Sequence, residues 1–232
     1  MDIKEVGLVN PATHWYYQSK LTAVRQLLPV LPEHLITVDV GAGSGFFGIS
    51  SAEDRPNSSA IFIDPEYKNE VPESLREFQT FSECPHKPGN LYLLIDLLEH
   101  VVDDVELLSH FVREAKADST FIITVPASMA LWSPHDDFLE HERRYTRREL
   151  EQTVILSGLI VEQSKYLFSI LTPIIFLIRK VKSKSNRPRS DMREMSVITN
   201  SVLRAICNFE HKYVSNRLFG LSVIISAKKP AT

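Results

Sequence analysis

Three glycines at alternate positions, directly after the first apolar run, constrain the fold of this chain more than any other feature of its sequence. The run ITVDV at residues 36–40 is followed by Gly41, Gly43 and Gly45. Glycine lets the backbone turn sharply and approach a ligand where a Cβ atom would collide. A second apolar run ends in Asp64, 19 residues past Gly45, where a carboxylate can accept hydrogen bonds from both hydroxyls of a ribose. The loop therefore predicts a nucleoside-binding site at the end of a strand.

Asp39 bears on which nucleoside cofactor the loop holds. Residues 43–48, GSGFFG, also have the GxGxxG spacing of dinucleotide-binding enzymes, which is a weak signal alone. Asp39 lies two positions before the first glycine, where it would repel a pyrophosphate but suits a cationic sulfonium ligand with a free ammonium group. We therefore expect a sulfonium cofactor. An NAD(P)-dependent oxidoreductase and a glycine turn without a ligand remain the alternatives.

Apolar runs of strand length alternate with helical patterns along the chain. Helical spacing of apolar residues occurs within residues 10–32, at 103–116 and at 195–217. Apolar strands that alternate with helices are typical of a parallel sheet covered on both faces. We expect an α/β, Rossmann-like sheet that is mostly parallel, with an antiparallel last strand and a helical insertion before it. Its seven strands are expected at residues 36–40, 60–63, 77–81, 91–95, 120–125, 159–166 and 221–228, with the weakest pattern at 77–81.

Length and charge narrow the classes of protein to consider. At 232 residues, the chain is expected to be a single domain, residues 1–232. A net charge of −3 with a pI of about 6.2 argues against a general nucleic-acid binder. Residues 179–193 carry seven cationic side chains and one acidic side chain, a local balance of +6. Without a signal-like start, we expect a cytoplasmic protein in which Cys84 and Cys207 are buried thiols.

Three ordered motifs resemble the class I S-adenosylmethionine (SAM) dependent methyltransferases. The loop at residues 39–45 looks like the first motif of that family, and LIDLLEHV at residues 94–101 is similar to its fourth-strand segment. Residues 126–150 look like the region after the fifth strand in a bacterial subgroup, methyltransferase types 11, 12 and 23, that is associated with glycan and lipid assembly. The aromatic opening HWYY at residues 14–17 also resembles that subgroup. The resemblance covers residues 14–166 and the final strand.

The resemblance implies SAM as the cofactor and assigns roles around it. The loop glycines would cradle the methionine part, Asp64 would hold the ribose, and Asp39 would face the amino end. Asp96 and Leu97, at the end of the fourth strand, would lie beside the sulfonium. Residues 82–86 lack the usual acidic adenine motif, so the adenine contact is unassigned. The implied reaction is methyl transfer to a small-molecule or lipid-linked acceptor, at oxygen.

Histidines after the fifth strand are candidates for the proton transfer that a hydroxyl acceptor needs. His135 and His141 fall where open α/β sheets bind ligands, and Asp136 is adjacent to orient His135. His100 is expected to be a capping or cofactor-pocket group. The same loop offers candidate substrate-binding side chains, which are Trp132, Arg143, Arg144 and Tyr145. The spacing of His135, Asp136, His141 and Glu142 matches no zinc pattern, so no metal is expected.

An apolar run followed by a basic stretch predicts that residues 167–217 form a helical lid or a membrane contact. The run YLFSILTPIIFLI at 166–178 is too short to span a bilayer as a helix. Joined to the cationic residues 179–193, it is typical either of a helical lid or of an interfacial contact with an anionic membrane. Both interpretations favour an acceptor with an apolar part. A non-catalytic, membrane-binding module with a SAM fold is the remaining alternative.

Overall fold

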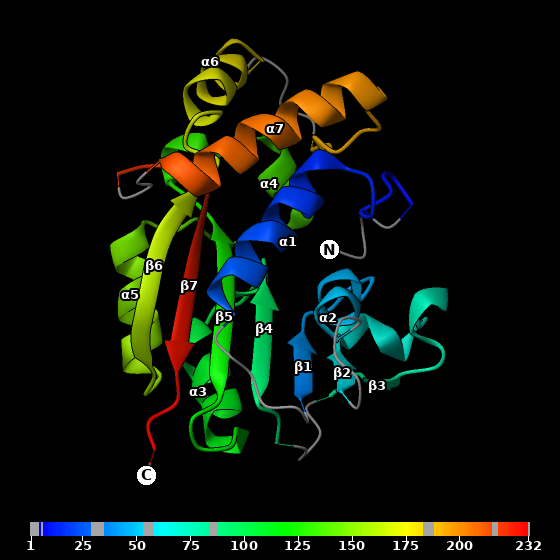
Figure 1. Ribbon diagram of the computed structural model, residues 1–232, viewed down its shortest axis with the longest axis vertical. Coiled ribbons are helices and arrows are strands. Elements are labelled where there is room, and N and C mark those ends of the chain that lie inside the picture. The colour runs from blue at the N-terminus through cyan, green and yellow to red at the C-terminus, as the bar shows by residue number, and fades with distance from the viewer. Residues whose placement is uncertain are drawn as a thin grey trace.

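The predicted strands form one seven-stranded sheet with the order β3-β2-β1-β4-β5-β7-β6 (Figure 1). The computed structural model describes residues 5, 7–28, 35–52, 58–83, 88–182, 188–214 and 218–231. Strands β1 to β5 pair in parallel, and β7 runs antiparallel to both β5 and β6. The predicted sheet is confirmed. The strands are β1 (Ile36–Val40), β2 (Ser59–Ile63), β3 (Gln79–Phe81), β4 (Leu91–Ile95), β5 (Thr120–Pro126), β6 (Ile160–Leu167) and β7 (Ser222–Lys228).

Helices cover both faces of the sheet, because successive side chains of the buried strands alternate between the faces. Leu91, Leu93 and Ile95 of β4 pack in one core cluster with residues of α1 (Trp15–Leu27) and α7 (Val197–Tyr213). Tyr92 and Leu94 pack in another with residues of α3 (Asp104–Glu114) and α5 (Arg147–Leu156). In Figure 1, α1 crosses in front of the sheet, α7 runs across its upper end, and α3 and α5 lie behind it. The other helices are α2 (Phe46–Ala52), α4 (Pro134–Leu139), α6 (Thr172–Lys182), η2 (Pro65–Lys68), η3 (Glu73–Leu75), η4 (Leu98–His100) and η5 (Met129–Leu131).

Strand register brings the candidate site together at one edge of the sheet. Val40 at the end of β1 pairs with Ile63 of β2 and Leu94 of β4, and Ile95 pairs with Thr124 of β5. The carboxyl ends of β1, β2, β4 and β5 therefore reach the same level. The glycine loop, Asp64, Asp96 and the loops after β4 and β5 all begin there.

In its described residues, the insertion predicted at 167–217 contains two helices, α6 and α7, that stack above the sheet (Figure 1). Glu210 of α7 is 1% exposed, and its carboxylate accepts hydrogen bonds from the backbone N–H groups of Ser169 and Ile170, at 2.9 and 2.7 Å. Asn200 accepts one from the N–H of Trp15 at 3.0 Å, which ties α7 to α1. Glu210 therefore joins α7 to the start of the insertion, and Asn200 joins α7 to the rest of the domain.

Some predictions fall on residues outside the described parts of the chain. These are Cys84, residues 183–187 of the basic stretch at 179–193, and the end of the helical pattern at 215–217. Cys207 is buried as predicted, and its burial raises the pKa of the thiol to about 11. In the described residues, no helix combines the length and the apolar character needed to cross a membrane.

Candidate functional site

The glycine loop adopts a backbone conformation that requires glycine. Gly41 and Gly45 have φ angles of 67° and 74°, in the left-handed region that side chains disfavour. A Cβ atom on Gly41 would lie 2.6 Å from Cδ1 of Leu97, and one on Gly45 would lie 2.3 Å from Cδ2 of Leu75. The glycines thus allow the loop to pack closely against Leu97, after β4, and against Leu75 of η3.

Asp64 holds the loop from the neighbouring strand end. Its Oδ2 accepts a hydrogen bond from the N–H of Gly43 at 2.9 Å, and its Oδ1 accepts one from the N–H of Glu66 at 3.0 Å. The hydroxyl of Tyr67 donates to the carbonyl of Gly43 at 2.7 Å. Asp64 is 8% exposed. The structure thus brings together the glycine loop and the carboxylate that the sequence assigned to ribose binding.

Asp39 lies beneath the loop. It is 2% exposed, and its Oδ2 accepts a hydrogen bond from the N–H of Gly48 at 2.9 Å. A Cβ atom on Gly48 would lie 2.8 Å from that oxygen. Burial, assisted by the charge of Asp64, raises the pKa of Asp39 to about 7. Asp39 therefore fixes the turn into α2, and its predicted contact with a ligand remains a prediction.

At the end of β4, Asp96 is paired with a lysine that the sequence analysis missed. Lys20 of α1 is completely buried and donates hydrogen bonds to Asp96 and, at 2.7 Å, to the hydroxyl of Tyr16. Thr124 donates to Asp96 at 2.9 Å. Burial opposes the charge of Asp96, but the ammonium of Lys20 and these hydrogen bonds outweigh it and lower the pKa. A lysine in an amphipathic helix is ordinarily assigned to solvent, so the sequence carried no signal for this pair.

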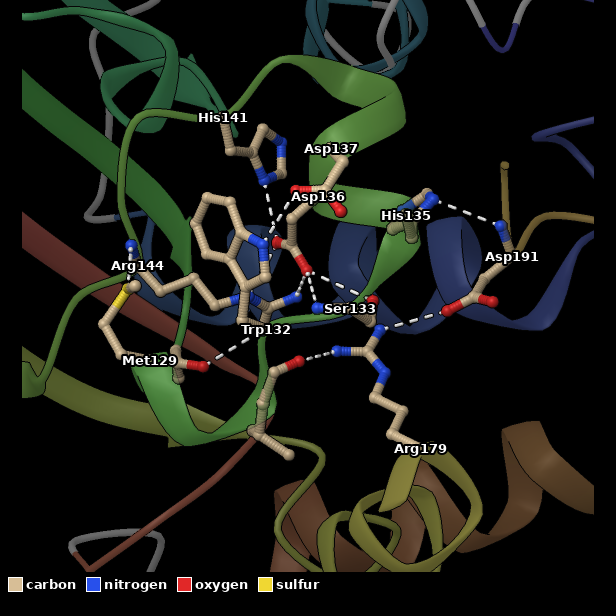
Figure 2. Close-up of polar contacts among 12 residues, drawn as sticks. Met129, Trp132, Ser133, His135, Asp136, Asp137, His141, Arg144, Arg179 and Asp191 are labelled. Atoms are coloured by element: carbon tan, nitrogen blue, oxygen red, sulfur yellow. Dashed lines mark hydrogen bonds and ion pairs between the residues drawn. The ribbon is translucent and has the colours of Figure 1, made fainter. Parts of the chain in front are cut away.

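Asp136 orients His141 and not His135, contrary to the prediction (Figure 2). His141 Nδ1 lies 3.0 Å from Asp136 Oδ1. Arg144 binds the same carboxylate through two hydrogen bonds, from Nε at 2.7 Å and Nη2 at 3.0 Å. The N–H of Ser133 donates to it at 2.8 Å and closes the capping box that starts α4. These partners lower the pKa of Asp136 in spite of its burial. The helix cap points the carboxylate away from its neighbour in sequence.

His135 instead faces the segment that precedes α7 (Figure 2). Its Nδ1 accepts a hydrogen bond from the N–H of Asp191 at 3.1 Å and lies 3.8 Å from a carboxylate oxygen of Glu5. Burial lowers the pKa of His135. Arg179 of α6 donates to the carbonyl of Leu131 and contacts Asp191 at 3.2 Å. Arg179 is therefore occupied with internal contacts.

The four candidate substrate-binding residues all have partners within the protein. Arg144 and Tyr145 are buried, and the hydroxyl of Tyr145 donates to Asp104 at 2.7 Å. Arg143 donates to the carbonyl of Val102 at 2.7 Å. Trp132 donates to Asp137 at 2.9 Å. In this structure Arg144 and Tyr145 hold the loop together and do not present free polar groups to solvent, because each lies in the core with its polar end paired.

Glu99 and His100, which follow β4, lie close to His141 in the loop after β5. The N–H of Glu142 donates to the carbonyl of Glu99 at 2.8 Å, which joins the loop after β5 to η4. The rings of His100 and His141 are 4.7 Å apart and nearly perpendicular. Glu99 is completely buried, and burial, with the nearby charge of Asp96, raises the pKa of its carboxyl. The sequence analysis gave Glu99 no role.

A cavity of about 530 Å³ opens beside the glycine loop, between the N-terminal segment, α1 and α2. It meets the loop at Ser44 and Phe46, and neither Asp64 nor Asp96 lines it. The side chains that line it include Val9, Gln18, Leu21 and Arg25. This cavity is therefore distinct from the edge of the sheet where Asp64 and Asp96 lie at strand ends.

Comparison with known proteins places this fold. No family model matches the sequence, and no curated protein matches it. A SAM-dependent methyltransferase of Thermotoga maritima, described as a possible histamine N-methyltransferase, is 17% identical and superposes with a TM-score of 0.58 over 93% of this chain and 89% of its own. A mycolic acid cyclopropane synthase is 12% identical, with a TM-score of 0.57 over 98% and 93%. The cyclase SpnF is 12% identical, with a TM-score of 0.58 over 97% and 85%. At this identity the similarity establishes the fold.

Proposed function

We propose that this chain, which has the fold of class I SAM-dependent methyltransferases, transfers a methyl group from SAM to an oxygen of a small-molecule or lipid-linked acceptor. One observation carries the proposal. Asp64 is held against the N–H of Gly43 at the carboxyl edge of a parallel sheet, which is where open α/β sheets bind nucleosides.

The residues at this edge fit the parts of SAM. Gly41, Gly43 and Gly45 leave room for the methionine part, and Asp64 offers its carboxylate to the ribose. Asp96 and Leu97 would lie beside the sulfonium, and the negative charge of Asp96 favours a cation there. Asp39 would act on the amino end from beneath the loop. When bound, SAM supplies the electrophilic methyl group.

His141 is the better placed of the two candidate bases. Its Nδ1 lies against the carboxylate of Asp136, so the neutral ring carries its proton on Nδ1 and leaves the Nε2 lone pair free to accept another. His135 accepts a hydrogen bond at Nδ1 from Asp191, so its neutral ring carries the proton on Nε2 and has no lone pair there. Asp136 would then be the positioning residue for His141.

Binding of SAM is expected to depend on Asp64. We expect Asp64→Asn to weaken the affinity for SAM by about 10-fold or more in a calorimetric titration, because a charged acceptor of ribose hydroxyls is lost. Glu66→Gln is the matched control, since Glu66 is exposed and lies two positions away. Equal affinities for both variants would contradict the role of Asp64. A parent protein that binds NADH and not SAM would contradict the proposal itself and favour the oxidoreductase.

The exposed face of α6 supports an acceptor or surface of apolar character. Ile174, Leu177 and Ile178 are 57%, 62% and 47% exposed, and Lys180 is exposed beside them. An apolar helix face next to a cation is typical of contact with an anionic membrane. We therefore propose that α6 brings the site to a membrane surface that holds the acceptor.

Sedimentation with vesicles tests the membrane contact. We expect the protein to sediment with vesicles of anionic phospholipid at low salt and less so at high salt, because the cationic stretch is screened. The double variant Ile174→Glu, Leu177→Glu should lose most of this binding. Ile155→Glu, at a 60% exposed position of α5 on the opposite face, should retain it. Equal binding by both variants would contradict a contact through α6. A protein that binds vesicles and SAM but never methylates an extract would be the non-catalytic module.

A further inference from the structure

Glu99, His100 and His141 place three metal-binding atoms close together at the carboxyl ends of β4 and β5. One ligand atom from each side chain lies within 4.8 Å of the other two. A divalent ion with bonds of about 2.0–2.2 Å to nitrogen and oxygen separates ligand atoms by up to about 4 Å. The three side chains therefore need only small movements to share one ion. We propose that they form a binding site for a divalent transition-metal ion.

The buried carboxylate of Glu99 is the first argument for an ion. Glu99 is 0% exposed, and within the described residues neither of its side-chain oxygens has a hydrogen-bond partner. Buried polar groups are almost always paired, because an unpaired one loses its interactions with water and gains nothing. A proton on Glu99 would not solve this, since its O–H would then also need an acceptor. A bound cation satisfies both oxygens.

The orientation of His141 is the second argument. Metal-binding histidines commonly donate their other ring N–H to a carboxylate, which fixes the ring and strengthens the ligand. Asp136 takes this place at Nδ1 of His141, and it is itself held by Arg144. The Nε2 atom is thereby left for the ion. Asp136 was among the residues first weighed as metal ligands, but its oxygens are fully engaged in this supporting role.

Two imidazoles and one carboxylate select the chemical class of the ion. Nitrogen donors favour zinc, cobalt, iron or manganese over calcium and magnesium, which prefer oxygen. Three protein ligands also leave coordination positions open for an exogenous oxygen. Glu99 lies three residues after Asp96, so an acceptor oxygen bound there would lie next to the proposed sulfonium position. This last step rests on the proposed function. With His141 Nε2 bound to the ion, the ion would lower the pKa of the acceptor hydroxyl, and the proton would pass to water instead of to His141.

Cobalt binding to the metal-free protein tests the site without measuring activity. The full chain is stripped with a chelator, titrated with Co²⁺ in the absence of SAM, and followed by visible absorption; Zn²⁺ is then added as a competitor. We expect one Co²⁺ per chain, displaced by Zn²⁺, with bands typical of nitrogen and oxygen ligands. Glu99→Gln and His141→Gln should each weaken the affinity by about 100-fold or more. His110→Gln, on α3 outside the cluster, should bind Co²⁺ like the parent.

Thermal unfolding and SAM titration separate a lost ligand from a lost fold. Zn²⁺ should raise the Tm of the parent and of His110→Gln but not of Glu99→Gln. Glu99→Gln should keep a cooperative transition without metal, since the substitution is isosteric and the side-chain oxygens of Glu99 have no hydrogen bond to lose. Absence of Co²⁺ binding by the parent, or equal binding by Glu99→Gln, overturns the metal site. Failure of SAM to bind while Co²⁺ does would overturn the proposed function and leave the metal site standing.

Discussion

Replacing Asp96 with asparagine is expected to lower the free energy of unfolding by about 3–5 kcal/mol. The reason is that Lys20 is completely buried, so its ammonium would keep its charge without a counter-ion. Asparagine preserves the shape of the side chain, tolerates the φ angle of 53° at this position, and can still accept the hydrogen bond from Thr124. The lowered free energy of unfolding would therefore measure the contribution of the negative charge of Asp96. Urea unfolding followed by circular dichroism measures it.

Asp118→Asn is a closely matched control. Asp118 also has a positive φ angle, of 64°, and also pairs with a lysine, Lys228, at 2.8 Å. The two pairs differ mainly in the burial of the lysine. The side chains of Lys20 and Asp96 are 0% and 32% exposed, whereas those of Lys228 and Asp118 are 41% and 57% exposed. We expect a far smaller change from Asp118→Asn, since water and salt screen the pair. Adding Lys20→Met to Asp96→Asn should restore most of the stability, and equal losses at both aspartates would contradict a buried ion pair.

Arg144→Met is expected to have the second large effect, again about 3–5 kcal/mol. Arg144 is 7% exposed and binds Asp136 through two hydrogen bonds. Without it, the fully buried carboxylate of Asp136 would retain only Ser133 and His141 as partners. The pKa of Asp136, which its partners hold down, should rise, so the variant should lose less stability at acidic pH than at neutral pH. Unfolding experiments at both pH values measure this difference.

Arg143→Met is the control for the neighbouring position. The side chain of Arg143 is 35% exposed and lies 3.8 Å from Asp104, so its removal should change the stability much less. If Arg144 instead contacted an anionic acceptor and had no structural role, Arg144→Met would leave the stability unchanged and would lower only the affinity for the acceptor. Equal stabilities of the two arginine variants would therefore contradict the structural assignment.

The main elements of the fold follow from local sequence patterns. The strand at residues 91–95 was predicted at its observed bounds, because continuous apolar residues bounded by polar ones mark a strand buried on both faces. The strand predicted from the weakest pattern, at residues 77–81, is shorter in the structure, where β3 spans Gln79–Phe81. It is an edge strand of the sheet, where partial exposure removes the apolar pattern. The glycine loop and Asp64 were also placed correctly, since both lie at strand ends whose level parallel pairing determines.

The sequence did not predict which side chains from distant segments pair with one another. Lys20 and Asp96 are 76 residues apart, and the lysine has no local feature that distinguishes it from a solvent-exposed one. Asp136 was assigned to His135 because they are adjacent, yet the first turn of α4 directs its carboxylate to Ser133 and His141. Glu99 belongs to the motif at residues 94–101, but its complete burial and its backbone hydrogen bond from Glu142 are properties of the folded chain.

The three alternate glycines, the carboxylate 19 residues later and the alternation of apolar strands with helices thus determined an α/β sheet with a glycine loop at the carboxyl end of its first strand. These features are local, since backbone conformation and the period of apolar residues depend on near neighbours. The partners of Lys20, Asp136 and Glu99 were decided only by tertiary structure. A charge can remain in the core only where packing brings it a counter-charge, a hydrogen-bond partner or a metal ion, and that meeting is a property of the folded chain.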